Sequence, residues 1–555
     1  MTANSVEKLD RLRASGLRLA MVSLTVLAGL VVASAQNKHT HFSPGNLVVS
    51  RGVYDNNPKN VTVGQLLPPN CQATQGGCNG NATNDGTYPF VWNNNLIDGS
   101  FGITSKLFLD QYTAAGTFIN SLEVPSRSRH GVPDHEGRMV TSFSSKSEVA
   151  LNLSTDGEFL TFMGYDSAID KLDVSNSNTP GVVDPTNPVG ENFYRTVALV
   201  DARGEFKFTD TNAYSGNNGR AAILNNADDG NFFYTGGNAG NGGTPQPNGV
   251  IIAAGSQILN LETKAERAQR PRLPTPLASF NITQLGDSSD KIGKDDNFRG
   301  LTIFNNVLYY TKGSGGNGVN TVYFVDPTFT VCNDSNGIGL PPANAMLPDH
   351  RLHYDPKVLQ TKGLDPNNMC VLNGFPTALK STTSFPFGIW FADANTLYVA
   401  DEGNGDNTFA NGMYTVAASQ TTAGLQKWTF DSGKGQWTLA YVLQSGLQLG
   451  VPYTVNGYPT GNNPATGLPW SPGTDGLRNI TGVENGDGTA TIYAITSTVS
   501  GNGDQGADPN QLVAITDTLS ARRLPSGESF SPLVTAQFAE VLRGVSFTPG
   551  SGGAH

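Results

Sequence analysis

Short apolar runs separated by turn residues recur along most of the chain. The clearest example is residues 385–404, FPFGIWFADANTLYVADEGN, where apolar side chains alternate with others up to a turn at residues 393–395. A second β-rich run at residues 397–399 follows this turn and ends at residues 401–403. Two such runs joined by Asp and Asn predict a β-hairpin.

The hairpin pattern repeats in four further stretches, at residues 148–165, 220–238, 299–314 and 478–497. A half pattern stands near each end of the chain. Residues 543–549 look like a first strand without its partner, and residues 45–51 look like a second strand without its predecessor. A third strand is expected in each unit, at residues 106–116, 195–204, 249–255, 321–327, 425–430 and 511–518.

Repeated units of about four antiparallel strands predict an all-β fold, the β-propeller. We expect six blades, or seven if a long insertion hides a degenerate unit. The ring would close by pairing the N-terminal and C-terminal strands. Residues 36–555 would form this single domain, with long insertions rich in Gly and Asn. Outside the strands, only residues 258–270, ILNLETKAERAQR, look helical.

Residues 1–35 have the organisation of a secretory signal peptide. A basic start precedes an apolar run at residues 19–32, and Ala33-Ser34-Ala35 is a small-residue cleavage site. The run is shorter than the roughly 20 residues of a membrane span. We therefore expect a secreted, extracellular or periplasmic protein, or a signal-anchored one if cleavage fails. No other stretch is apolar enough to cross a bilayer.

The even number of cysteines is consistent with an exported protein that contains disulfides. Four cysteines in an exported chain predict two disulfides, Cys71 with Cys78 and Cys332 with Cys370. No C-x-x-C pair is present, so we expect no cysteine metal site. The glycosylation sequon at Asn479 falls on a predicted innermost strand, where a glycan would not fit.

The charge of the chain limits the classes of molecule that the protein is expected to bind. The formal net charge is −11 at pH 7, which argues against nucleic acid because a phosphate-binding surface is normally basic. The long insertions at the rims of a rigid ring are the places where a binding surface is expected. An extracellular glycan, a protein or a small anionic ligand is the expected partner.

Two motifs carry a resemblance to known groups. LYVADEGN at residues 397–404 resembles the core of the NHL repeat. The runs LSTDG at residues 153–157 and SGNNGR at residues 215–220 resemble a large group of uncharacterised exported bacterial-type propellers. The resemblance covers most of residues 42–548 and implies the fold and export. It implies no activity.

The search for catalytic or metal-binding motifs finds weak candidates. The pairs His350 with His353 and His130 with His135 could offer two imidazoles, and residues 313–320 are Gly-rich without the Lys-Ser/Thr end of a phosphate loop. No cofactor is expected, although calcium is possible.

The calcium candidates are Asp401, Glu402 and Asp406. They do not match a known calcium-loop spacing, so we interpret them as turn carboxylates.

A set of arginines at equivalent positions of the repeats is a stronger candidate for a binding site. Four predicted inner strands begin with arginine: Arg220, Arg299, Arg478 and Arg543. The first strand of every blade lines the axis, so equivalent positions form a ring at one mouth of the channel. The arginines could hold an anion by charge-assisted hydrogen bonds, or pair with carboxylates and carbonyls of adjacent blades and lock the ring. The two roles are compatible.

Two functions of different classes remain open. The first is an exported binding or scaffold protein whose rim loops or axial mouth contact a glycan or another extracellular partner. The second is an extracellular hydrolase or lyase acting on an anionic ester, lactone or uronate at the axial channel. Arginine would then stabilise charge and a His or Tyr would act as acid-base. The first is favoured because no nucleophile or metal-ligand set is recognisable.

Overall fold

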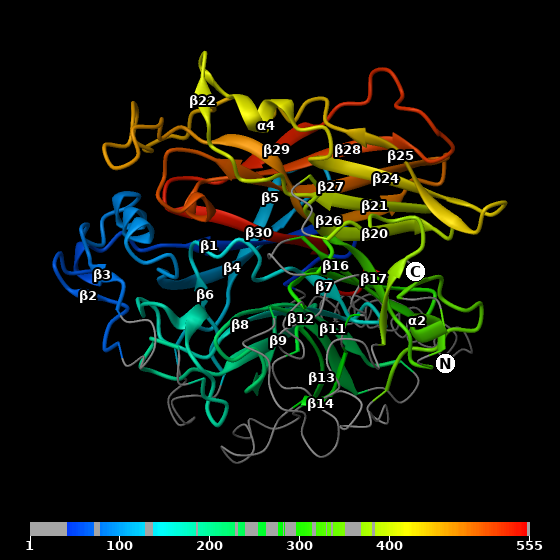
Figure 1. Ribbon diagram of the computed structural model, residues 1–555, viewed down its shortest axis with the longest axis horizontal. Helices are drawn as coiled ribbons and strands as arrows, with labels where there is room; N and C mark the ends of the chain where they lie inside the picture. Colours follow the sequence, from blue (N-terminus) through cyan, green and yellow to red (C-terminus); the bar gives the residue numbers. More distant parts are fainter. Residues whose placement is uncertain are drawn as a thin grey trace, which may run out of the picture.

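The computed structural model describes residues 41–71, 78–127, 137–184, 187–227, 231–238, 254–261, 276–280, 282, 296–313, 318–328, 330–334, 337–349, 368–379 and 383–551. Over these residues, six small antiparallel sheets stand in a ring (Figure 1). The first strands of neighbouring sheets contact one another in a closed cycle, so they surround the axis. The six-bladed β-propeller predicted from the repeats is confirmed.

Blade 1 closes the ring. Its innermost strand is β30 (Glu540–Phe547) from the C-terminal part, which pairs antiparallel with β1 (Leu47–Val53) from the N-terminal part. The strands β4 (Thr104–Tyr112) and β5 (Phe118–Glu123) complete the sheet. Figure 1 shows β30 in red beside β1 in blue. The expected pairing of the two chain ends is confirmed.

The other five blades follow in chain order, each beginning with its innermost strand. Blade 2 contains β7 (Asn152–Leu153), β8 (Phe159–Tyr165), β9 (Arg195–Asp201) and β10 (Phe206–Thr211). Blade 3 contains β11 (Gly219–Asn225), β12 (Phe232–Gly237), β13 (Ser256–Asn260) and β14 (Pro276–Phe280). Blade 4 contains β15 (Phe298–Phe304), β16 (Val307–Lys312), β17 (Thr321–Val325) and β19 (Met369–Leu372), with β18 (Ile338–Gly339) parallel to β19.

Blade 5 contains β20 (Pro386–Asp393), β21 (Thr396–Asp401), β24 (Gly424–Asp431) and β25 (Gln436–Leu443). Blade 6 contains β26 (Gly473–Glu484), β27 (Thr489–Val499), β28 (Gln511–Thr518) and β29 (Ser531–Thr535). The hairpin predicted at residues 385–404 is β20 paired with β21, with Trp390 opposite Tyr398.

Minor elements lie between these strands. Two short hairpins are β2 (Leu66–Leu67) with β3 (Gly80–Asn81) and β22 (Phe409–Ala410) with β23 (Met413–Tyr414), and β6 (Thr141–Ser142) pairs with β4. The short helices among the described residues are α2 (Thr330–Asp334), α4 (Thr415–Ser419) and four 3₁₀ segments, η1 (Pro58–Asn60), η2 (Phe90–Leu96), η3 (Val174–Asn176) and η4 (Gln505–Ala507). Within the described segments, none of these helices has the length and apolar character to span a bilayer.

Two expectations were wrong in blade 3. Its third strand is Ser256–Asn260, not the apolar run at residues 249–255, of which 249–253 lie outside the described residues. The same strand contains Ile258, so the helix expected at residues 258–270 does not begin there, and residues 262–270 lie outside the described residues. Burial decides the outcome, because Ile258 is fully buried between its neighbouring strands and local helix propensity cannot offset that packing.

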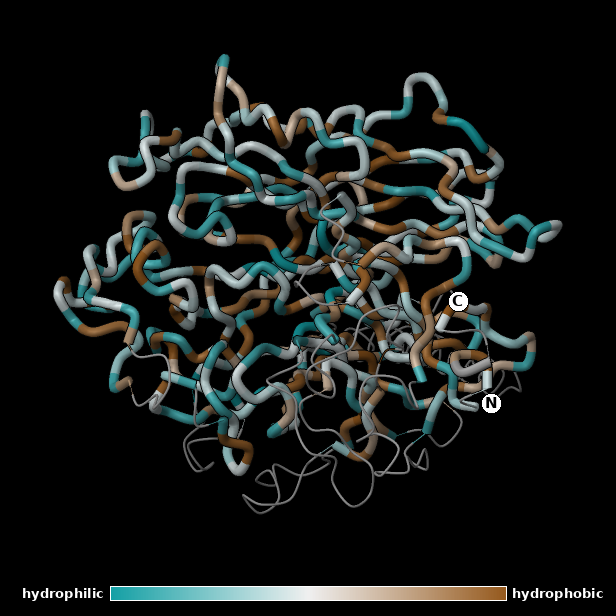
Figure 2. The backbone as a smooth tube through the Cα atoms, in the orientation of Figure 1, coloured by the Kyte–Doolittle hydropathy of each residue, from teal (hydrophilic) through white to brown (hydrophobic). Residues whose placement is uncertain are grey.

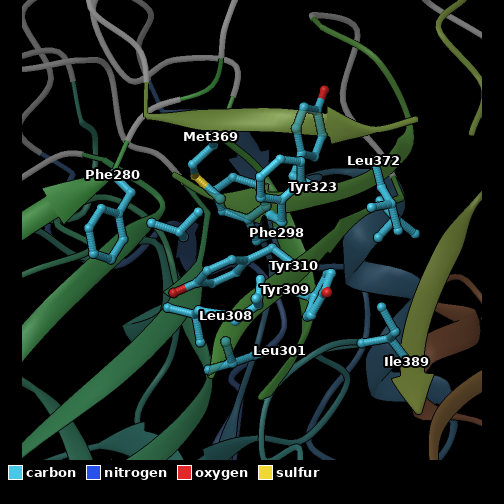
Figure 3. Packing of buried hydrophobic residues seen from close by; sticks show 14 of the residues in the cluster. Phe280, Phe298, Leu301, Leu308, Tyr309, Tyr310, Tyr323, Met369, Leu372 and Ile389 are labelled. Carbon is cyan, nitrogen blue, oxygen red and sulfur yellow. The ribbon is translucent and has the colours of Figure 1, made fainter. Parts of the chain in front are cut away.

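The core lies between blades. The largest buried cluster combines Phe280 of blade 3, Phe298 and Tyr310 of blade 4 and Ile389 of blade 5 (Figure 3). Aromatic rings also stack between blades 4 and 5, where the ring centroids of Phe304 and Phe391 lie 4.5 Å apart. Figure 2 shows that hydrophobic segments follow the strands inside the ring, while polar segments dominate the outer loops. Each blade therefore depends on its neighbours for burial.

Both predicted disulfides are present. Cys71 bonds to Cys78 within the first insertion, and Cys332 bonds to Cys370, joining α2 to the outer strand β19 of blade 4. Disulfides persist in oxidising compartments, so they suggest an extracellular or periplasmic location. Residues 1–35 lie outside the described residues, and the signal peptide remains a prediction.

Candidate functional site

The inner strands share a β-bulge at one level of the axis. In five blades an extra residue breaks the register with the second strand, and the breaks fall at Arg220, Arg299–Gly300, Phe387–Gly388, Arg478–Asn479 and Arg543–Gly544. A bulge bends the strand and re-aims its side chains. All four arginines of the predicted ring stand at these bulges.

At this level each inner strand touches the next one. Ala150 N donates to Arg220 O at 3.2 Å, and Asn479 Nδ2 donates to Arg543 O at 2.8 Å. A Cβ added to Gly388 would lie 2.5 Å from Arg478 O, so only glycine allows this approach. The bulges therefore form a continuous belt of contacts around the axis, which we call the bulge belt.

Glu402, the residue after β21, joins two of the arginines. Arg478 Nε donates to Glu402 Oε2 at 3.2 Å, and Arg299 Nη2 lies 3.8 Å from Glu402 Oε1. Arg299 also reaches Ser147 of the blade 1–2 connection, with Nη1 to Oγ at 2.6 Å. Because Arg299 belongs to blade 4, this bond shows that side chains from non-adjacent blades meet at the axis.

Arg220 is held by the next blade. Its Nη1 donates to Phe298 O at 2.7 Å and to Asn297 Oδ1, and its Nε donates to Asn218 Oδ1 at 3.2 Å. Burial, followed by the nearby Arg299 charge, lowers the pKa of Arg220 well below its ordinary value. The arginine thus stabilises the blade 3–4 contact at the cost of a poorly compensated charge.

Arg543 is the least satisfied member. The residue is only 3% exposed, and its Nη2 donates to Ser142 O at 3.3 Å. Its Nε and Nη1 are buried and have no hydrogen-bond partner among the described residues. Burial lowers the pKa of Arg543 to about 10, with Glu148 opposing and Arg478 adding to this shift.

The charges of the four arginines therefore repel one another. Burial also lowers the pKa of Arg299, Glu402 counteracts this effect, and Arg478 adds to it. We call Arg220, Arg299, Arg478 and Arg543 the axial arginine cluster. Arg220, Arg478 and Arg543 are buried and Arg299 is mostly buried, and the acidic groups that act on them most directly are Glu402 and Glu148. Four guanidinium groups thus lie in one region of a protein whose net charge is negative.

Glu148 occupies the equivalent position of blade 2, and its role was not predicted. Its Oε2 accepts hydrogen bonds from Thr141 Oγ1 at 2.9 Å and Ser142 N at 3.1 Å, and its Oε1 accepts one from Tyr165. The next residue, Val149, has a φ of 61°, a strained conformation for a β-branched residue. Aligning the repeat starts would have placed Glu148 in the ring, but the strain could not be foreseen.

The three carboxylates considered as calcium ligands already bind other groups of the protein. Asp401 Oδ2 accepts Phe385 N at 2.8 Å, and Asp406 Oδ1 accepts Thr408 N at 2.8 Å. Burial raises the pKa of Asp401 to about 6. With Glu402 bound to arginines, the interpretation of these groups as turn and pairing carboxylates fits the geometry.

The remaining candidates are metal ligands, a Gly-rich loop and a glycosylation sequon, and some of them lie outside the described residues. One group of three potential metal ligands lies within the described residues, Asp326, Cys332 and Cys370, and its cysteines are consumed by the disulfide. The histidine pairs 130 with 135 and 350 with 353 lie outside the described residues, as do residues 314–317 of the Gly-rich run at 313–320. Asn479, 6% exposed, uses its amide to bind Arg543 O, which leaves no room for a glycan.

Comparisons with known proteins add little to this geometry. No protein-family model and no curated protein matches the chain. Among solved structures, the parainfluenza virus 5 hemagglutinin-neuraminidase ectodomain is similar over 95% of this chain and 97% of that chain, at 10% identity and a TM-score of 0.29. Prolyl oligopeptidase B from Galerina marginata is similar over 80% of this chain and 41% of that chain, at 8% identity and a TM-score of 0.23.

Similarities this low give no information on activity, so the site is interpreted from its own residues. They also leave the resemblance to NHL repeats and to exported propellers a prediction beyond the six-bladed fold itself.

Proposed function

We propose that the protein is an exported binding protein that holds an anionic ligand, an acidic glycan of the uronate class, at the axial arginine cluster. The observation that carries this proposal is the guanidinium of Arg543. Two of its nitrogens are buried without a partner among the described residues, and three other arginines lie close by. Buried donors are normally satisfied, so these donors call for an acceptor.

The physics favours an anion as that acceptor. Like charges that are buried together destabilise one another, and the ion pairs of Glu402 with described residues are those with Arg299 and Arg478. A carboxylate, sulfate or phosphate would relieve this repulsion and form charge-assisted hydrogen bonds with guanidinium groups. A uronate also offers hydroxyl groups for the polar loops at the rim.

The test measures thermal unfolding with and without anion at fixed ionic strength. Sulfate, phosphate and an oligogalacturonate should each raise the Tm of the mature protein, because ligands that bind only the folded state stabilise it by mass action. Arg543→Gln should remove this rise. Arg203→Gln is the matched control, since Arg203 is 61% exposed and pairs with Asp201 and Glu205 on the surface.

A wild-type Tm that is the same in chloride, sulfate, phosphate and oligogalacturonate would refute the proposal. The arginines would then serve only to lock the blades together. In that case Arg543→Gln should be destabilised even without anion, because it would remove the hydrogen bond from Arg543 Nη2 to Ser142 O and leave that carbonyl without this donor.

The alternative is a hydrolase or lyase at the same mouth, and one observation bears on it. Tyr165 donates to Glu148, and burial together with the Glu148 charge raises the pKa of Tyr165 well above its ordinary value. Tyr165 therefore stays protonated and could act as a general acid. However, Tyr165 and Glu148 are fully buried and already hydrogen-bonded, which favours a structural role. Turnover of chromogenic esters or unsaturated uronate products, lost in Tyr165→Phe, would support catalysis instead.

A further inference from the structure

Two buried carboxylates lie apart from the axial cluster, beside the first insertion. Asp98 follows η2, and Asp173 precedes η3. Both side chains are fully buried. Neither belongs to an ion pair among the described residues. Uncompensated buried carboxylates are costly, so their surroundings require an explanation.

The two carboxylates bind the same stretch of backbone. Asp98 Oδ1 accepts Ser100 N at 3.0 Å, and Asp173 Oδ1 accepts Gly102 N at 3.1 Å. The main chain of Asp173 is attached there as well, since its N donates to Gly102 O at 2.8 Å. Peptide groups two residues apart thus hold both carboxylates close together.

Each carboxylate keeps one oxygen without a partner. Asp98 Oδ2 and Asp173 Oδ2 are both buried, and neither accepts a hydrogen bond from any described residue. The charges also act on each other, because burial and the Asp98 charge hold the pKa of Asp173 well above its ordinary value. Two neighbouring carboxyl groups that each keep an unpartnered oxygen, with the charge of one disfavouring ionisation of the other, form a pattern that a bound cation would satisfy.

Further oxygen atoms lie beside Asp98 and beside Gly102, the residue whose backbone binds Asp173. Ser100 Oγ lies 2.6 Å from Asp98 Oδ1. A Cβ added to Gly102 would lie 2.6 Å from Ser142 Oγ and 3.6 Å from Ser175 Oγ. The surroundings therefore include carboxylate and hydroxyl oxygens, which are hard ligands. They also include the amide of Asn79, whose Nδ2 donates to Asp98 Oδ1 at 2.7 Å and leaves Asp98 Oδ2 open.

We propose that Asp98 Oδ2 and Asp173 Oδ2 bind one calcium ion that joins the first insertion to the loop before η3. Calcium is the best match because it accepts an irregular set of six to eight oxygens and retains water where protein ligands are few. Two carboxylates make a weak site, roughly in the 10⁻⁴–10⁻³ M range of extracellular calcium modules. The proposal is independent of the anion site.

Metal analysis and thermal unfolding of the mature protein test this site. Protein dialysed against about 1 mM calcium chloride, which is at or above the expected dissociation constant, should retain roughly half to one calcium per chain. Its Tm should exceed that in EDTA by about 1 °C, because a site of this affinity adds only about 1 kcal/mol to the stability of so long a chain. Magnesium should produce a smaller rise. Asp173→Asn should abolish both the bound calcium and the difference in Tm.

Asp487→Asn is the control, because Asp487 is an exposed turn residue. It should keep the calcium response of the wild type. Wild-type protein that binds no calcium and melts equally in calcium and EDTA would overturn the proposal, and Asp173 would then simply hold a proton. A calcium response that survives in both Asp98→Asn and Asp173→Asn would overturn it too, by placing the ion elsewhere. The wild-type measurements decide the matter even if a variant fails to fold.

Discussion

At the scale of single residues, Asp475 near the start of β26 makes the axial region sensitive to pH. Its carboxylate accepts hydrogen bonds from Gly405 N at 2.8 Å and Gln420 Nε2 at 2.5 Å. Burial raises its pKa to about 7, and the charge of Glu402 adds to this effect. The folded protein therefore holds a proton on Asp475 at a pH where the unfolded chain has lost it.

The sign of the resulting pH dependence follows from linkage. A folded-state pKa above the ordinary 3.8 adds stability that is fully present below that value and is lost as the pH rises through about 7. Wild-type protein should thus lose ~2–4 kcal/mol relative to Asp475→Asn between pH 4 and pH 8. Urea unfolding of both proteins across this range measures the difference. Parallel stability profiles would contradict the assignment.

Residue patterns reveal the arginines but not their partners. Arg220, Arg299, Arg478 and Arg543 could be found because each opens a repeat. Glu402 could not be paired with Arg299 and Arg478, because the contact depends on how far the end of β21 extends into the neighbouring blades. Asp98 and Asp173 stand in different insertions, and only the packing of these insertions brings them together.

At the scale of elements, one buried ion pair joins blades 5 and 6. Lys427 Nζ on β24 lies 2.7 Å from Asp517 Oδ2 on β28, and neither side chain is exposed. The hydroxyl groups of Tyr398 and Tyr441 also donate to Asp517. The sequence predicts the strand that contains Lys427, but its alternation cannot show that a lysine is buried at that position.

Removing this cation should weaken the blade 5–6 contact. We expect Lys427→Met to lower the free energy of unfolding by ~3–5 kcal/mol, because Asp517 would keep a buried charge without its counterion. Lys434→Met is the matched control, since Lys434 is 67% exposed beside Asp431, and it should change stability little. Urea unfolding followed by tryptophan fluorescence compares both with the wild type. Equal stability of the two variants would exclude a stabilising role for the pair.

Strand prediction succeeded where a turn separates two apolar runs, as between β20 and β21. It failed in blade 3, where the outer half of the blade follows a long insertion without a hairpin signal. An inserted loop hides which apolar run continues the sheet, because either run could supply the next strand until its packing is known.

At the scale of the whole molecule, stability depends on the closure of the ring in blade 1. Deleting residues 540–555 would remove β30 and expose the edge of β1 together with the inner faces of β26 and β7. An exposed hydrophobic strand edge favours aggregation. We expect the truncated protein to form oligomers in size-exclusion chromatography and to lose its single cooperative unfolding transition. A monomer with an unchanged transition would show that closure is dispensable.

The position of the seam has a consequence for the chain's connectivity. The two described ends touch, since Gly45 N donates to Ser551 Oγ at 2.9 Å and Thr548 N donates to Asn46 O at 2.9 Å. A covalent link between these ends, with new chain termini in the turn at residues 432–435 between β24 and β25, would preserve every strand pairing. The blade built from both ends of the chain would then be blade 5 instead of blade 1. The ring itself has no first blade, so a circularly permuted chain could in principle encode the same molecule.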